Sequence, residues 1–302
     1  INESIFSLLA DLDPDNIDAL HRVADNVQEM IKSAVIPDDV HKMIDEGYSL
    51  LCTQCEVNDL PVAVRSSATA EDLPTASFAG QQDTYLWIMN AERVIESVRK
   101  CWASLYTPRA ISYRVKNDFP HEKVLISVGV QKMVNSKAAG VMFTLNPTDG
   151  DISKVVIEGS WGLGETVVSG SVNPDKFVVD KVMGEINERT ISTKHIECVF
   201  DVEKGETVDA DVDEDLQCTC CLEDPEITEL VKTAKTIEAH YGRAMDIEWA
   251  IDKDFSFPDN IFIVQARPET VWSQRKVESK LGKKSGYQLL MDQAMKRIKL
   301  PE

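Results

Sequence analysis

The stretch Val62-Ala63-Val64-Arg65-Ser66-Ser67-Ala68-Thr69-Ala70-Glu71-Asp72 decides what fold and site we expect. A short apolar run ends on Arg65, and two serines, small residues and two acids follow it. This order predicts a strand that ends in a polar loop. An arginine at that point can hold an anion with its planar fork, and backbone N–H groups of the loop can add to the site. We therefore expect a phosphate-binding loop here.

Helical patterns surround this loop on both sides. Asp13-Pro14 can cap and open one helix, and Pro37 opens a second that extends to about Gln54. Residues 92–118 are typical of two helices that break at Thr107-Pro108. The first 120 residues are thus expected to form a lobe in which helices accompany the phosphate loop.

Strand patterns dominate the middle and the end of the chain. We expect strands at residues 61–65, 83–88, 124–134, 140–145, 154–158, 176–180, 185–191, 244–251 and 260–265. One helix is expected from Asp224 to His240, with Gly242 as its stop, and acidic residues 201–229 are expected mostly as solvated loops and edge strands. Helices and mainly antiparallel strands alternate without a βαβ repeat, a GxGxxG turn or a Walker A motif, which predicts an α+β fold and argues against a Rossmann domain.

Length and charge limit the possible functions. The chain has 302 residues, of which 43% are hydrophobic, and this favours two lobes. A net charge of -19 argues against nucleic acid as a partner, since phosphate binding needs basic patches. No apolar run approaches the ~18 residues of a membrane span, and no secretory signal is visible. We expect no membrane partner and a cytoplasmic protein.

Two compositional features remain open. Seven cysteines are scattered and are expected as reduced thiols; Cys52 and Cys55 together with residues 218–221 could instead bind a metal, which we weigh as the poorer interpretation. The segment 273–302 carries eight Lys/Arg and three Asp/Glu, a net of +5. It is expected as a basic helix, which is either a docking segment or an ordinary solvated helix.

Residues 244–250 alternate polar and apolar side chains, which places Asp246 and Glu248 on one face of a strand. Carboxylate oxygens are the ligands that Mg²⁺ prefers, although a solvent-exposed strand face would have the same pattern. If the next strand is its hairpin partner, Gln265 and Arg267 lie near Glu248. Such a set can bind metal and stabilise a transferring phosphoryl group.

Three weaker signals accompany this set. A glycine-rich turn at 158–165 and a second turn at 168–176 allow a close approach to a ligand or simply a sharp bend. Gln131 ends a long strand that could line an adenine slot or could be ordinary core.

Taken together, these segments resemble the nucleotide-binding domain of the phosphoenolpyruvate synthase, pyruvate phosphate dikinase, rifampicin phosphotransferase and phenylphosphate synthase family. The likeness covers roughly residues 60–272, in the order of the family's motifs. The residues that carry it are Val64–Asp72, Phe78–Gln82, Gly140–Thr144, Gly162–Glu165, Val172–Asp175 and Gln265–Thr270.

The resemblance implies an ATP-grasp fold with ATP and Mg²⁺ between an N-terminal lobe (1–120) and a C-terminal lobe (121–272). By likeness, Arg65 and Arg267 contact phosphate and act in catalysis. Glu248 and Gln265 hold Mg²⁺. By the same likeness, Gly80 and Thr84 line the phosphate or ribose side of the site, and Gln131 lies near the base.

Members of this family pass the β-phosphoryl of ATP to a histidine on a swivelling domain, which gives AMP and phosphate. Neither the family's glycine-rich lysine segment nor its Ser-His acceptor motif is recognisable in this sequence, so we expect the histidine on a partner chain or another segment. Phenol, as in phenylphosphate synthase, is the expected final acceptor. The alternatives are a piece of phosphoenolpyruvate synthase or of rifampicin phosphotransferase, and, from another class, a non-catalytic nucleotide-sensing module.

Overall fold

The computed structural model describes residues 1–10, 12–69, 72–73, 76–77 and 83–272. The expected basic helix at 273–302 and the expected site residue Gly80 lie outside these ranges. The helices are α1 (Asn2–Leu9), α2 (Ile17–Ser33), α3 (Asp38–Gln54), α4 (Ala91–Ser104), α5 (Pro108–Lys116), η1 (His121–Lys123), α6 (Glu165–Val168), α7 (Glu214–Gln217) and α8 (Asp224–Tyr241).

The strands fall into sheets that are antiparallel throughout the described residues, as expected for this α+β chain. They are β1 (Val62–Ala68), β2 (Asp72–Leu73), β3 (Ala76–Ser77), β4 (Thr84–Ile88), β5 (Ile126–Lys132), β6 (Ser136–Phe143), β7 (Lys154–Trp161), β8 (Asp175–Asp180), β9 (Ile186–Thr190), β10 (Ile196–Asp201), β11 (Glu206–Asp211), β12 (Met245–Asp252) and β13 (Ile261–Pro268).

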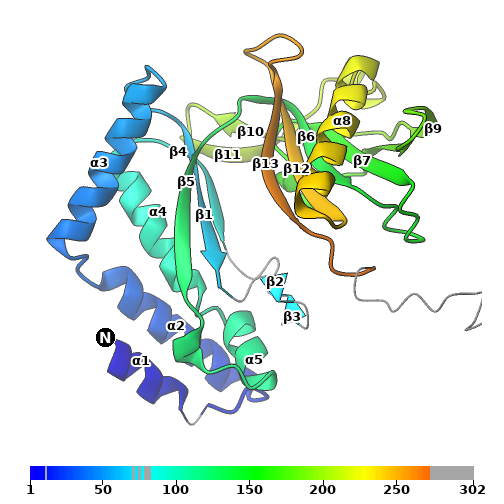
Figure 1. Cartoon of the computed structure of the whole chain (residues 1–302). Coiled ribbons are helices and arrows are strands. Elements are labelled where there is room, and N and C mark those ends of the chain that lie inside the picture. The colour runs from blue at the N-terminus through cyan, green and yellow to red at the C-terminus, as the bar shows by residue number, and fades with distance from the viewer. Residues whose placement is uncertain (11, 70–71, 74–75, 78–82, 273–302) are drawn as a thin grey trace, which may run out of the picture.

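The first lobe is a three-stranded sheet, in the order β4-β1-β5, with helices on the side that faces away from the rest of the molecule (Figure 1). Apolar residues of β1, among them Val62 and Val64, are fully buried against α3 and α4. Helices α1, α2 and α5 form a separate small core around Val27 and Ile111. Strand β1 continues to Ala68, so Arg65 lies within the strand and not at its end as predicted, and its side chain bonds Glu248 of the second lobe.

The start of α2 differs from the expectation at Asp13-Pro14. The helix begins at Ile17 because the side chain of Asn16 accepts a hydrogen bond from the backbone N–H of Ala19. The break between α4 and α5 falls as predicted: Thr107 caps α5 and Pro108 occupies its first turn.

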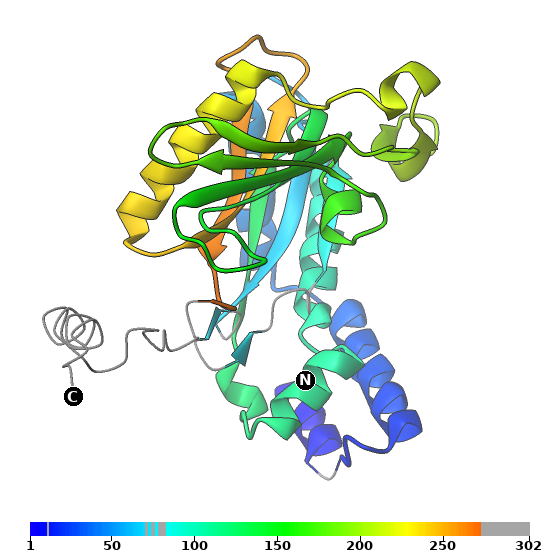
Figure 2. The same cartoon turned by 90° about the vertical axis from the view of Figure 1, so that its right-hand side faces the viewer.

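The second lobe is a six-stranded sheet in the order β13-β12-β6-β7-β8-β9, and α8 lies along one face of it (Figure 2). Ile227, Leu230 and Ala234 of α8 are buried against that face. The helix is held at its start by a reciprocal capping box of Glu223 and Glu226, and it ends at Gly242 in the left-handed conformation. One face of the sheet is therefore core, and the other face is left for a site.

The chain crosses from the first sheet to the second at a later position than the expected lobe boundary between residues 120 and 121. Strand β5 still pairs with β1, so the change of sheet falls between Lys132 and Ser136. The backbone of this connection is fixed by Asn135, whose N–H donates to Asp252.

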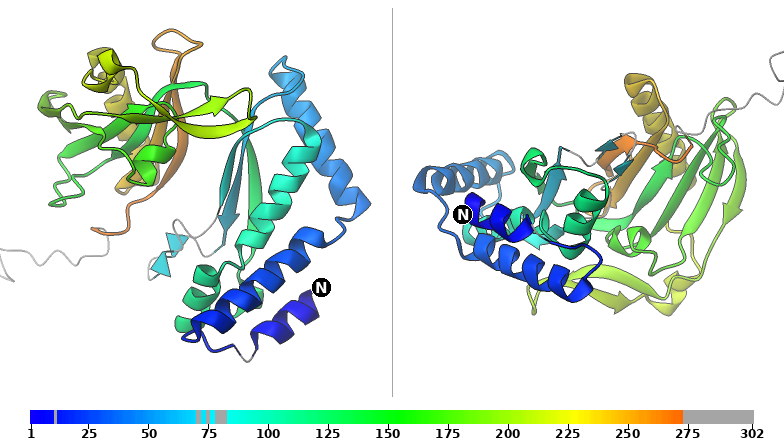
Figure 3. Two further views of the ribbon diagram at one scale, coloured as in Figure 1. Left: turned by 180° about the vertical axis from the view of Figure 1, so that it is seen from behind. Right: turned by 90° about the horizontal axis from the view of Figure 1, so that it is seen from below.

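A second connection is the ribbon β10–β11, which reaches from the second lobe to β4 of the first (Figure 3). Its Phe200 ring stacks on Trp87 with centroids 4.8 Å apart, and Arg93 donates to the carbonyl of Gly205. The expectation of loops and edge strands at 201–229 is right for β11, and α8 begins at Asp224 as predicted, but the short helix α7 was not expected.

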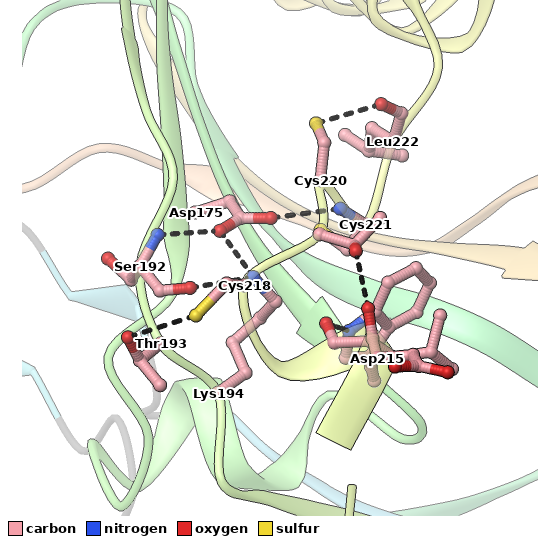
Figure 4. A network of polar contacts seen from close by, with 12 residues as sticks. Asp175, Ser192, Thr193, Lys194, Asp215, Cys218, Cys220, Cys221 and Leu222 are labelled. Atoms are coloured by element: carbon pink, nitrogen blue, oxygen red, sulfur yellow. Dashed lines mark hydrogen bonds and ion pairs between the residues drawn. The ribbon is translucent and has the colours of Figure 1, made fainter. Parts of the chain in front are cut away.

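The base of this ribbon is anchored by a fully buried ion pair between Asp175 and Lys194 (Figure 4). The Lys194 ammonium lies 2.7 Å from the Asp175 carboxylate, which also accepts the N–H groups of Ser192 and Cys221. A buried pair is tolerable only when such further hydrogen bonds satisfy it.

The seven cysteines are free, and no group of three or more metal-binding side chains occurs among the described residues.

Candidate functional site

The site is built on the hairpin of β12 and β13. Glu248 lies directly opposite Gln265, and Asp246 lies opposite Arg267. The alternate residues Met245, Ile247 and Trp249 are fully buried under α8, so the two acids point to the other face of the sheet. The predicted strand-face alternation and the predicted hairpin pairing are both present.

A β-bulge shapes the middle of this hairpin. The register shifts after Glu248, because Trp249 pairs with Ile263 and leaves Val264 without an opposite residue. The carbonyl of Val264 accepts hydrogen bonds from Arg65 Nη1 at 3.1 Å and from Gln131 Nε2 at 3.4 Å. The bulge therefore supplies an acceptor that bonds two side chains of the first lobe.

Arg65 crosses from β1 to this hairpin and bonds three of its groups. Its Nη2 atom donates to Glu248 Oε2 at 2.8 Å and also to Gln265 Oε1. The side chains of Arg65 and Glu248 remain 23% and 22% exposed. The guanidinium thus holds the two lobes together at a place that solvent can reach.

Arg267 is held by the neighbouring acid. Its Nε and Nη2 atoms each lie 2.8 Å from Asp246 Oδ2. Burial raises the pKa of the Asp246 carboxyl, the Arg267 charge opposes this shift, and the nearby carboxylates of Glu248 and Glu269 add to it. Arginine and acid therefore alternate on this face in two adjacent pairs.

The remaining expected residues are placed less closely. Thr84 opens β4 directly opposite Arg65 and is exposed. Gln131 shares the Val264 carbonyl with Arg65. Five of the expected site residues therefore gather at one junction of the two lobes: Arg65, Gln131, Glu248, Gln265 and Arg267.

The glycine-rich turn has a packing role in this structure. Gly162 has φ +73, and a Cβ there would lie 2.4 Å from the Cys198 carbonyl oxygen. Its carbonyl accepts the Ser136 hydroxyl, 2.8 Å away. The glycine allows the turn to pack against β10, which is the sharp-bend alternative for this motif.

The donor set fits a hard divalent cation. Glu248 offers a carboxylate and Gln265 an amide oxygen, both already turned toward a cation, the Arg65 guanidinium. Mg²⁺ is usually held by one or two protein carboxylates plus substrate phosphates rather than by an all-protein cage. Two oxygen ligands beside two arginines therefore suit a metal that arrives with a phosphate ligand.

Sequence reasoning missed two features of this site. The Val264 carbonyl belongs to the site only because of the bulge, and no residue type in the strand predicts that bulge. The pairing of Asp246 with Arg267 follows from the hairpin register, which the sequence analysis used only to bring Arg267 near Glu248.

Two α+β lobes, with arginines and potential oxygen ligands of a metal ion between them, are an arrangement typical of nucleotide-binding domains. The sequence matches the family described as pyruvate phosphate dikinase, AMP/ATP-binding domain, over residues 1–286. This chain belongs to that family.

Curated relatives agree with this membership. The chain is 47% identical over 306 residues to a probable phosphoenolpyruvate synthase of Staphylothermus marinus, which covers 94% of this chain and 37% of the relative. It is 47% identical to a probable phosphoenolpyruvate synthase of Methanocaldococcus jannaschii, over 92% of this chain and 23% of the relative. A phosphoenolpyruvate synthase of Aeropyrum pernix is 44% identical over 84% of this chain and 34% of the relative.

The chain thus spans between about a quarter and two fifths of the length of these relatives. Phenol as final acceptor gains no support from them, since each of these relatives is named for phosphoenolpyruvate; they favour the alternative reading. None of the helices in the described ranges is long and apolar enough to cross a bilayer.

Proposed function

We propose that this chain is the ATP- and Mg²⁺-binding part of a dikinase-type phosphotransferase of the phosphoenolpyruvate synthase kind. The observation that carries the proposal is the junction where Arg65 of one sheet bonds Glu248 and Gln265 of the other, with Arg267 two residues further along the same strand. Family membership supports nucleotide binding, and the relatives' names support phosphoenolpyruvate as the product of the whole protein.

In this proposal the lobes form an ATP-grasp site. Arg65 and Arg267 bind the polyphosphate and stabilise the charge that develops on the transferred group. Thr84 lines the phosphate or ribose side, and Gln131 lies toward the base. Glu248 and Gln265 hold Mg²⁺, which when bound neutralises phosphate charge. The protein's work is positioning and electrostatic stabilisation.

Two phosphoanhydride bonds of ATP break in the proposed transfer, one between the α- and β-phosphorus and one between the β- and γ-phosphorus. The β-phosphoryl of ATP bonds to a histidine nitrogen on another chain or another part of the protein, and the bond to AMP breaks. Water takes the γ-phosphoryl as inorganic phosphate. The phosphohistidine then donates to the final acceptor.

Isotope exchange tests the proposal against a non-catalytic nucleotide-sensing module. The full-length protein, or this chain with the histidine-bearing part added, should catalyse exchange of label between AMP or phosphate and ATP. Tight MgATP binding without any exchange would support the sensing module instead and would contradict the proposed transfer.

A further inference from the structure

One cation of this chain already bonds the whole set of oxygens proposed to hold the metal. Arg65 Nη2 donates to Glu248 Oε2 and Gln265 Oε1, and its Nη1 donates to the Val264 carbonyl. The same guanidinium is proposed to bind nucleotide phosphate. In this structure the guanidinium therefore bonds the oxygens that the metal would use, and the guanidinium is itself the group that the phosphate would use.

Arg65 and a divalent metal compete for these oxygens. The Glu248 and Gln265 oxygens that Arg65 now bonds are the ones that Mg²⁺ would take at about 2.1 Å in near-octahedral geometry. Two cations so close together also repel strongly in a partly buried site. Departure of the guanidinium therefore favours binding of the metal.

We propose that Arg65 is a placeholder cation for the metal. It neutralises Glu248 until the metal arrives, and the metal then displaces it from Glu248 and Gln265. The released guanidinium turns to the phosphate that comes with the metal. The inference rests on the proposed nucleotide site and adds how that site is filled: metal and nucleotide bind as a pair, because each takes up a group that the other releases.

The exchange also changes the contact between the lobes. Arg65 belongs to β1 of the first lobe, while all three of its acceptors belong to β12 and β13 of the second. Its release leaves the Gln131 bond to Val264 in place at this junction. Loading of the site is therefore coupled to a rearrangement of one interlobe contact.

The test measures binding of Mn²⁺ alone, without nucleotide, by electron paramagnetic resonance. The Arg65→Met variant should bind Mn²⁺ at least about tenfold more tightly than the unmodified chain, since a competing cation is gone from a partly buried carboxylate. The same variant should bind ATP more weakly. Higher affinity for Mn²⁺ together with lower affinity for ATP is the result that identifies the exchange.

Lys132→Met is the charge control. Lys132 ends β5 next to Gln131, and its ammonium lies over the Phe255 ring. Its removal deletes one positive charge near the site without vacating Glu248 or Gln265, so Mn²⁺ affinity should change less than about twofold. Equal tightening in both variants would assign the effect to net charge and overturn the proposal, as would no tightening in Arg65→Met.

A crystal structure of the unmodified protein with Mn²⁺ and no nucleotide does not depend on the variant folding. The proposal expects an anomalous peak at Glu248 and Gln265, with Arg65 turned away. Mn²⁺ bound there beside an unmoved Arg65 would overturn it. The proposed function is judged separately by MgATP binding to the unmodified protein: that binding can hold while the exchange fails, and its loss would remove the function whatever Mn²⁺ does.

Discussion

At Glu248 a single carboxylate has two partners in succession: Arg65 in this structure and, in our proposal, a metal ion. The side chain suits both because it is only partly buried and faces the junction of the lobes. A fully buried carboxylate would cost too much to leave unpaired while the partners change. Partial exposure is thus part of how the residue can work.

Replacement of Glu248 with Gln should weaken Mg²⁺-dependent ATP binding by about tenfold or more, because a neutral amide is a poorer metal ligand. Glu158→Gln is the matched control: Glu158 lies on the same sheet face, and Val141 separates the two residues in the register. Calorimetric titration with MgATP measures both. Equal losses in the two variants would contradict a metal role for Glu248.

Replacement of Arg267 with Ala should slow phosphoryl transfer by ~10³-fold or more, by analogy with arginines that clamp a transferring phosphoryl group. Arg243, an exposed arginine just before β12, is the control, and Arg243→Ala should leave the rate nearly unchanged. Single-turnover formation of AMP gives the rate. A loss of ATP affinity with an unaltered transfer step would show that Arg267 only binds.

At the scale of elements, the centre of the six-stranded sheet depends on a close approach between β6 and β7. A Cβ at Gly140 would lie 2.0 Å from the Glu158 carbonyl oxygen. Backbone cannot yield as a flexible side chain can, so the strands would have to separate. The acids of β12 pair with β6 and would lose their support as well.

Gly140→Ala should therefore lower the free energy of unfolding by about 3 kcal/mol. Gly47→Ala is the matched control: Gly47 lies inside α3 with open space around it, so the same change should stabilise the chain by up to about 1 kcal/mol. Urea unfolding measures both. Destabilisation by the two changes alike would show that the strand contact is not the cause.

The end of α5 carries a pH-dependent contact. His121 Nδ1 accepts a hydrogen bond from Arg114 Nε at 2.9 Å. Burial and, to a smaller extent, the Arg114 charge lower the pKa of His121 from 6.5 to about 4. Between these two values the unfolded chain binds a proton that the folded chain does not, so stability falls as the pH falls from 6.5 to 4.

The loss should be on the order of 2 kcal/mol, since the site is only partly buried. His121→Gln should remove this part of the pH dependence while it retains a hydrogen-bonding side chain. Thermal unfolding between pH 7 and pH 4 makes the comparison. The same slope in the variant and the unmodified chain would contradict the assignment.

The hairpin of β12 and β13 shows how far sequence reasoning reached within an element. Alternation placed Asp246 and Glu248 on one face, because side chains of a strand alternate whatever the rest of the fold does. The bulge at Val264 could not be foreseen, since it depends on how two strands and the first lobe fit together. The distances among Arg65, Glu248 and Gln265 likewise follow only from tertiary packing.

At the scale of the whole molecule, an antiparallel α+β protein followed from strands and helices that alternate without a βαβ repeat. The order of the strands did not follow, because β13, the last strand among the described residues, forms one edge of the six-stranded sheet while β6 lies inside it. The stacking of Trp87 on Phe200, two rings more than a hundred residues apart, did not follow from the sequence either. Such pairings are set by long-range contacts that no local pattern records.

Contacts between the described parts of the two lobes include the Arg65 bonds, the Gln131 bond, the Lys132 ammonium over the Phe255 ring, and the ribbon whose Phe200 stacks on Trp87. Lobes connected in this way can admit a ligand between them without disturbing either core. Arg65 and Gln131 contribute from one lobe, and Glu248, Gln265 and Arg267 from the other. The proposed nucleotide site is thus complete only when both lobes are in place.

The proposed transfer to histidine can be followed with labelled ATP in the full-length protein. With ATP labelled at the β-phosphorus, the label should become bound to a histidine as AMP forms, and label at the γ-phosphorus should appear as inorganic phosphate. Stable labelling of the protein from the γ position, or no labelling from either position, would contradict the proposed transfer of the β-phosphoryl to histidine.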